Sequence, residues 1–132
     1  MGIKQYTVGK KWEQEIISYY HKKGYFAYKI PTEFNGTLFD IIVARNGSCM
    51  FIEAKHTKTN KLYYKGSGIY KKREELDRFI EKTNNNIFIF IKSDTLGYYW
   101  TTWLKSKDLF EKQGYLDLKK DCFCANGGGM NV

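Results

Sequence analysis

The chain has 132 residues, which is enough for one compact domain but not for two, so we expect a single domain over residues 1–132. Hydrophobic residues make up 42% and aromatic residues 17%, a composition that argues against intrinsic disorder. The formal net charge of +8 favours a polyanionic partner such as nucleic acid, and the lack of a long apolar run or a signal peptide predicts a cytoplasmic protein without membrane contact.

An amphipathic helix is predicted over residues 7–23, and it carries one acid on its apolar face. At about 100° per residue, four apolar side chains share this face: Trp12, Ile16, Ile17 and Tyr20. Glu13 falls within the same face, whereas Glu15 falls outside it. A carboxylate on a buried face needs a partner, a metal ion or a raised pKa. Glu13 is therefore a candidate functional residue, and Glu15 is its natural control.

A tight β-hairpin is predicted after a strand at residues 25–30 and a loop at residues 31–37. The stretch FDIIVARNGSCMFIEAKHTK places two apolar runs around Asn46-Gly47. This dipeptide is typical of a two-residue hairpin turn between antiparallel strands. A turn of that length sets the pairing of every residue along the two strands.

The predicted hairpin register gathers three charged side chains. Counting outward from the turn places Asp40 opposite Glu53, and Lys55 follows two residues later on the same face of the sheet. A slip of one residue would separate them. Two facing carboxylates repel each other unless a cation lies between them. Lys55 would make a structural ion cluster, and a hard divalent ion such as Mg²⁺ would make a metal site, so both interpretations stay open here.

The rest of the chain predicts an α/β domain with a mixed central β-sheet flanked by helices, because the elements follow the order α-β-β-β-α-β-β. We expect the core at about residues 7–104 and a flexible end at residues 121–132. The remaining predicted elements are a flexible loop at 58–68, a helix at 70–82, a buried strand at 87–92, an aromatic strand at 98–104 and a short helix at 107–113.

The charged group at the hairpin would suit phosphodiester hydrolysis. A divalent ion held by Asp40 and Glu53 would polarise a phosphate, lower the pKa of a bound water and offset transition-state charge. Lys55 would then orient the attacking hydroxide or stabilise developing negative charge. Glu13 would complete the metal shell directly or through a water molecule.

At these residues the sequence resembles the PD-(D/E)XK nuclease superfamily, and within it the archaeal Holliday junction resolvases. The bacterial RecU-type resolvases share the same core and are a near alternative. The resemblance covers about residues 7–103 and is carried by GKKWEQEIISYYHKKGYFAYKI, FDIIVARNGSCMFIEAKHTK and YKKREELDRFIEKTNNNIFIFIK.

The resemblance implies a restriction-endonuclease-like core and a homodimeric enzyme that makes paired nicks across a four-way DNA junction. It implies a dependence on Mg²⁺, with Mn²⁺ as a substitute. It also implies a catalytic set of Glu13, Asp40, Glu53 and Lys55, in which the backbone carbonyl of Ala54 joins the metal ligands.

The sequence departs from the family pattern around the loop before Asp40. Phe39 stands where the motif has proline, and Thr32 and Thr37 are the only hydroxyl residues available where the archaeal resolvases carry a functional serine. Two alternatives therefore remain beside the resolvase. One is a restriction- or repair-type nuclease on duplex or flapped DNA, and the other is a non-catalytic DNA-binding module of the same fold.

Basic side chains surround the candidate site in sequence and predict contacts to DNA phosphates, with a solvated basic surface as the alternative for each. Tyrosines at 63, 64 and 70 interleave with them and would pack on sugars or exposed bases. The predicted DNA-binding residues are Lys10, Lys11, Lys29, Thr32, Lys58, Lys61, Lys65, Lys71, Lys72 and Arg73.

Overall fold

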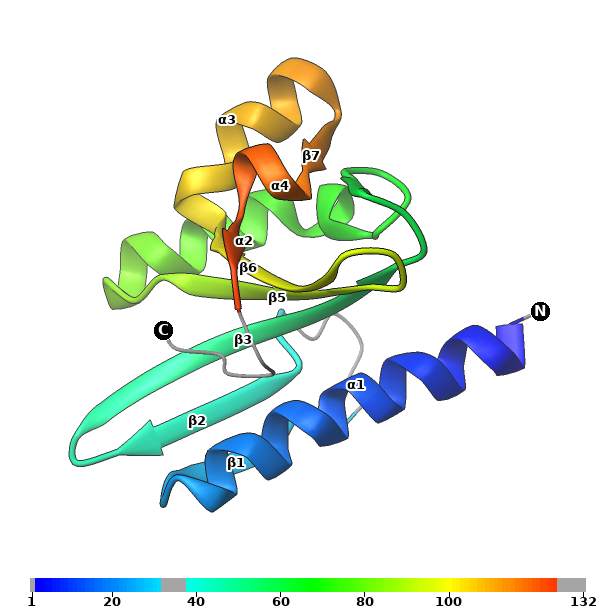
Figure 1. The fold of residues 1–132 in the computed structure, drawn as a ribbon. Helices are drawn as coiled ribbons and strands as arrows, with labels where there is room; N and C mark the ends of the chain where they lie inside the picture. Colours follow the sequence, from blue (N-terminus) through cyan, green and yellow to red (C-terminus); the bar gives the residue numbers. More distant parts are fainter. Residues whose placement is uncertain (1, 32–37, 126–132) are drawn as a thin grey trace.

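A mixed β-sheet with helices on both faces organises the chain (Figure 1). The computed structural model describes residues 2–31 and 38–125, with side chains from residue 9 onward. The elements run in the order α1 (Gly2–Lys22), β1 (Phe26–Lys29), β2 (Ile41–Arg45), β3 (Ser48–Thr57), β4 (Lys61–Tyr63), α2 (Ile69–Thr83), β5 (Ile87–Ser93), β6 (Gly97–Thr102), α3 (Trp103–Gln113), β7 (Tyr115–Asp117), α4 (Leu118–Asp121) and β8 (Phe123–Cys124). The predicted α/β class is confirmed.

The main sheet has the strand order β1-β2-β3-β5-β6-β8. β3 and β5 pair in parallel, and the other neighbours pair antiparallel. A parallel pair needs a crossover connection, and the segment containing α2 supplies it. β5 is buried along most of its length, as its continuous apolar sequence predicts.

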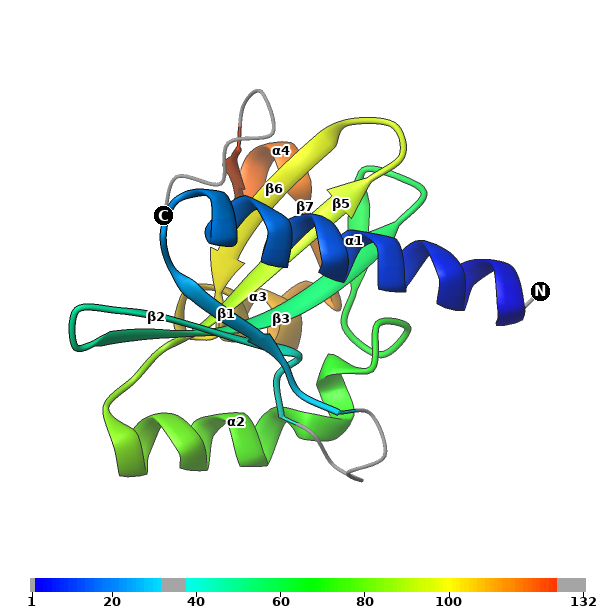
Figure 2. The ribbon, with the colours of Figure 1, turned by 90° about the horizontal axis from the view of Figure 1, so that it is seen from below.

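Two hydrophobic clusters pack on opposite faces of this sheet. Trp12 and Ile16 of α1 are buried against one face together with Ile52 and Phe90. α2 and α3 bury the other face. The cluster on that face includes Ile89, the neighbour of Phe90 in β5. Figure 2 shows α1 crossing its face of the sheet on the side away from α3. Because side chains alternate along a strand, each residue of β3 belongs to one helix layer or the other.

The hairpin between β2 and β3 has the predicted register. Asn46 and Gly47 both have positive φ values, 51° and 83°, as a type I′ turn requires. From this turn the pairing runs outward from Arg45 opposite Ser48 to Ile41 opposite Ile52. The two-residue turn and its ladder are therefore confirmed.

The segment predicted as a flexible loop at residues 58–68 instead carries strand β4. β4 pairs with β7, more than 50 residues later in the chain, in a separate two-stranded sheet. Leu62 and Tyr64 are buried, with exposed fractions of 2% and 3%. The sequence does not predict this burial, because the neighbours of the two residues are polar and basic. The strand that pairs with β4 is also distant along the chain.

The core extends beyond the predicted limit at residue 104. Phe110, Leu116 and Leu118 are fully buried in the cluster on the α2 side of the sheet. The predicted flexible end at 121–132 also begins too early, because β8 pairs with β6 and the ring of Phe123 stacks on Trp100 at 4.6 Å between centroids. Residues 126–132 lie outside the described part of the chain.

Leu116→Ala is expected to lower the free energy of unfolding by about 2–5 kcal/mol, because it removes a fully buried side chain from a packed core. The matched control is Lys119→Ala, which changes an exposed residue three positions later and is expected to stay within about 0.5 kcal/mol of the parent. Urea unfolding measures both. Equal stabilities of the two variants would show that the segment after residue 104 does not belong to the cooperative core.

Candidate active site

Asp40 lies where the hairpin ladder ends. Its backbone N–H donates to the carbonyl of Ile52 at 2.8 Å, so the pairing does not continue to Glu53 as the sequence predicts. The side chain of Asp40 instead accepts a hydrogen bond from the N–H of Ala54 at 2.9 Å. This bond holds the carboxylate beside β3, and Asp40 and Glu53 come together through it rather than as a ladder pair.

Glu53 is a buried carboxyl group on the α2 side of the sheet, with a side chain only 4% exposed. One oxygen, Oε2, accepts a hydrogen bond from Lys72 and lies 3.5 Å from Nζ of Lys55. The other, Oε1, is buried and has no hydrogen-bond partner among the described residues. Burial, and then the charge of Asp40, raise the pKa of Glu53 to about 8 against the opposing effect of the two lysines.

Lys55 is held between Glu53 and the turn that precedes α2. Its Nζ donates to the backbone carbonyl of Ser67 at 2.7 Å. Gly68 follows with a φ of 85°, a left-handed conformation that favours glycine, and a Cβ there would lie 4.0 Å from Nζ of Lys55. The turn therefore orients the lysine that the sequence places on the same face as Glu53.

Lys72 belongs to the group around Glu53, although the basic run that contains it predicts a contact to DNA. It comes from the first turn of α2 and binds Glu53 directly. Ile69 and Leu76, the two buried residues of α2, lie three positions before and four positions after it. Helical periodicity puts these three side chains on one face, and that signal would have placed Lys72 toward the sheet.

Glu13 lies near Asp40 but on the other side of the sheet from Glu53. Its carboxylate pairs with Lys29 at 3.2 Å. Burial, and then the charge of Asp40, raise its pKa above the ordinary value. Within residues 9–31 and 38–125, no three acidic, histidine or cysteine side chains gather closely enough to hold one ion. α1 packs on the face that Glu53 turns away from, so Glu13 approaches Asp40 rather than Glu53. Its place in the metal shell, directly or through a water molecule, stays a prediction.

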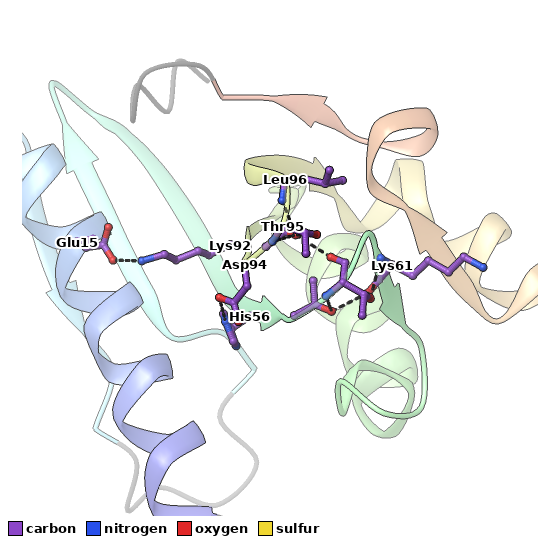
Figure 3. Close-up of polar contacts among 10 residues, drawn as sticks. Glu15, His56, Lys61, Lys92, Asp94, Thr95 and Leu96 are labelled. Atoms are coloured by element: carbon purple, nitrogen blue, oxygen red, sulfur yellow. Dashed lines mark hydrogen bonds and ion pairs between the residues drawn. The ribbon is translucent and has the colours of Figure 1, made fainter.

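Glu15, the acid outside the apolar face of α1, and His56, the residue after Lys55, make contacts away from Glu53 (Figure 3). Glu15 accepts hydrogen bonds from Lys92 at 2.6 Å and from the hydroxyl of Tyr98 at 3.2 Å. His56 pairs with Asp94 at 2.8 Å. Glu15 and Asp94 thus bind side chains of β3, β5 and β6 rather than the group around Glu53.

Comparison with known proteins agrees with this geometry. The family model described as archaeal Holliday junction resolvase (Hjc) matches residues 4–121. The chain belongs to this family. It is accordingly a Holliday junction-resolving nuclease, and the resemblance read from its sequence is confirmed.

The resolvase fold is also shared with a solved structure. The Hjc Holliday junction resolvase of Archaeoglobus fulgidus, an archaeal hyperthermophile, is 18% identical, with 74% of each chain covered and a TM-score of 0.57. At this identity the likeness establishes a common, restriction-endonuclease-like fold. A comparison with curated protein sequences found no match.

The donor set of the candidate active site fits a hard divalent ion. Asp40 and Glu53 offer carboxylate oxygens, and Oε1 of Glu53 is buried without a partner within the described residues. Mg²⁺ is commonly bound by one or two carboxylates together with water and substrate phosphate oxygens. The family's general use of divalent metals is thus matched by these two side chains.

The predicted DNA-binding residues fall into two groups. Five lysines are exposed, and they are Lys10, Lys11, Lys58, Lys65 and Lys71. The others are partly buried: Lys29 pairs with Glu13, Lys72 binds Glu53, Lys61 lies over the ring of Tyr115, and Arg73 lies over the ring of Tyr70. Thr32 lies outside the described residues. No helix within residues 2–31 and 38–125 has the length and apolar character needed to cross a membrane.

The stability of the metal-free resolvase is expected to fall as the pH rises from about 4.5 to about 8. Over that interval the folded state keeps a proton on Glu53 that the unfolded chain releases, because burial raises the pKa from 4.5 to about 8. Glu53→Gln removes this difference in proton binding. Between pH 5 and pH 8.5, the free energy of unfolding of the variant should therefore rise by about 2–4 kcal/mol relative to that of the parent. Urea unfolding in EDTA at several pH values measures it, and parallel curves for the two proteins would contradict the burial argument.

Proposed function

We propose that this resolvase is a Mg²⁺-dependent endonuclease that acts as a homodimer and uses Asp40, Glu53 and Lys55 for phosphodiester hydrolysis. Mn²⁺ would substitute for Mg²⁺. The observation that carries the proposal is the buried Glu53, which has one oxygen without a partner among the described residues and lies beside Asp40 and two lysines. A buried carboxylate in such a group is typical of a metal site and is unfavourable for stability alone.

Asp40, Glu53 and the carbonyl of Ala54 would hold the ion in this proposal. The ion would supply Lewis-acid polarisation of the scissile phosphate and a lowered pKa of a nearby water. Lys55, which Ser67 and Glu53 hold in place, would donate a hydrogen bond to the attacking water or to a phosphate oxygen. Lys72 would compensate the charge of Glu53, and Glu13 would act through water rather than as a direct ligand.

The homodimer follows from the reaction. Paired cuts at symmetric positions of a four-way junction need two equivalent active sites, and a two-fold axis provides them. Sedimentation velocity of the free protein and of its junction complex would test this arrangement. Two protomers per junction are expected, and a single bound protomer that makes both cuts would contradict it.

A cleavage assay on defined DNA structures tests the proposed function. A synthetic four-way junction, a flapped duplex and a linear duplex of matched sequence are incubated with Mg²⁺, with Mn²⁺ and with EDTA. Paired nicks in the junction alone, with either metal and not in EDTA, are the expected result. Equal cutting of the linear duplex would favour a restriction- or repair-type nuclease, and full activity in EDTA would exclude the metal-dependent mechanism.

Glu13→Gln is expected to lower junction cleavage by about tenfold, because it removes a half-buried charge near Asp40 that would act on the site through water. Glu15→Gln is the matched control on the same helix, and it should cleave within about twofold of the parent because its contacts are to Lys92 and Tyr98. Single-turnover cleavage rates measure both. Equal losses in the two variants would show that Glu13 has no special relation to the site.

A further inference from the structure

A groove with aromatic walls opens on the surface next to the turn before α2. It has a volume of about 650 Å³ and lies between residues 63–70 and the end of α3. Its lining includes the tyrosines Tyr63, Tyr64 and Tyr70, together with Phe110, Lys65 and Glu111. The site described above uses none of these side chains.

The inner wall of the groove is fixed by packing, whereas its rim is open. Tyr64 is buried and stacks on Phe110 with 4.7 Å between ring centroids and 13° between planes. Tyr70 meets Tyr64 edge-to-face at 5.1 Å. Tyr63 on the rim is 53% exposed. An exposed aromatic ring beside a rigid aromatic wall can stack with a flat ligand at little cost in side-chain freedom.

Lys65 lines this groove, and two further cations lie over aromatic rings in or next to its wall. Lys65 lies 5.0 Å and Arg73 3.9 Å from the centre of the Tyr70 ring, and Lys61 lies 4.5 Å from the centre of the Tyr115 ring. Within the described part of the chain, no carboxylate forms an ion pair with any of the three. Glu111, the acid in the groove, accepts a hydrogen bond from the hydroxyl of Tyr64 at 2.8 Å. A ligand of this groove would therefore combine a flat ring with nearby negative charge.

The groove and the candidate active site share one turn of the backbone. The N–H of Ser67 donates to the carbonyl of Tyr63 at 3.0 Å, and the N–H of Gly68 donates to the carbonyl of Lys65 at 3.2 Å. The carbonyl of Ser67 accepts from Lys55 at 2.7 Å. Gly66 lines the groove, and Ser67, the next residue, holds the catalytic lysine. The groove and Lys55 are therefore neighbours on either side of this turn.

We propose that this groove binds an unstacked nucleobase of the DNA substrate, with the base on Tyr63 and the flanking phosphates near Lys65 and Arg73. The inference rests on the proposed function and adds a source of substrate selectivity to it. Bases at the branch point of a four-way junction have lost part of their stacking, whereas those of a continuous duplex have not. Stacking on an aromatic side chain together with phosphate contacts from cations is the usual way in which proteins hold an exposed base.

Binding of junctions in EDTA, where metal-dependent cleavage does not occur, tests this assignment by fluorescence anisotropy. Tyr63→Ala should weaken junction binding about tenfold or more and leave linear-duplex binding within about twofold, because only the junction offers an unstacked base. Tyr63→Phe should retain the parent affinity, because the ring remains. Tyr28→Ala, which removes a 49% exposed tyrosine of β1, is the matched control and should leave both affinities unchanged.

A second substrate identifies the base itself as the ligand. A junction with abasic positions at the branch point should bind the parent protein about tenfold more weakly, and combining this junction with Tyr63→Ala should cause no further loss. Additive losses, or an equal loss on junction and duplex in Tyr63→Ala, would overturn the proposal. The proposal would also be overturned if Tyr63→Ala abolished binding of the free dinucleotide pTpT but left the preference for junctions at the parent level. If the parent protein does not prefer junctions at all, the proposed function fails instead.

Discussion

Asp40→Asn is expected to slow cleavage of a four-way junction by about 10³-fold or more, while the affinity for the junction stays within about twofold. Asparagine keeps an oxygen that can accept the hydrogen bond from the N–H of Ala54, so the local fold is retained. It loses the negative charge that would hold a divalent ion beside Glu53. Removal of a single preorganised electrostatic contact already costs about 10²–10³-fold, and loss of a metal ligand removes more.

Single-turnover rates on the junction, with binding measured in EDTA, separate the two effects of Asp40→Asn. Asp94→Asn is the control, since Asp94 is an exposed acid that pairs with His56 and lies outside the site. It should cleave at the parent rate. If Asp40→Asn cleaved as fast as Asp94→Asn with saturating Mg²⁺, the assignment of Asp40 as a metal ligand would be lost.

Lys72→Met is expected to slow junction cleavage at pH 7 by about 10²-fold and to displace the pH–rate profile toward higher pH. Lys72 is one of two cations that oppose the rise in the pKa of Glu53, so its loss leaves the buried carboxyl protonated over a wider pH range. A protonated carboxyl group is a poor metal ligand. Raising the pH should therefore restore part of the lost rate.

The adjacent Lys71 offers a control with the same charge change, because its side chain is exposed whereas that of Lys72 binds Glu53. Lys71→Met should keep the parent pH–rate profile and change only the salt dependence of DNA binding. Matching losses in the two variants, with unchanged profiles in both, would mean that Lys72 acts only as a phosphate contact. That was the role the sequence alone predicted for it.

The difference between these two lysines shows where reasoning from sequence reaches its limit. Composition does not distinguish neighbours, so the sequence predicts one DNA-binding group for the whole run of basic residues before and within α2. The structure separates them: Lys72 lies on the face of α2 that carries Ile69 and Leu76, whereas Lys71 points to solvent. Helical periodicity places Lys72 on the buried face of α2, but only the packed structure shows that this face lies against Glu53.

Glu13 shows a similar limit. Its position on the apolar side of α1 and its proximity to Asp40 follow from the helical spacing of Trp12 and Ile16. Its separation from Glu53 depends on which sheet face α1 covers. Strand alternation turns Glu53 toward α2, while its neighbour Ile52 packs under α1.

The order of residues along the chain was enough for the hairpin, because a two-residue Asn-Gly turn dictates every pair from Arg45–Ser48 to Ile41–Ile52. It was also enough for the buried strand β5 and the amphipathic helices, whose patterns are local. Contacts between distant segments required the tertiary structure: the β4–β7 pairing, the burial of Leu116, and the approach of Lys72 to Glu53. Such contacts depend on packing between elements that no local pattern encodes, and the last of them sets part of the charge environment of Glu53.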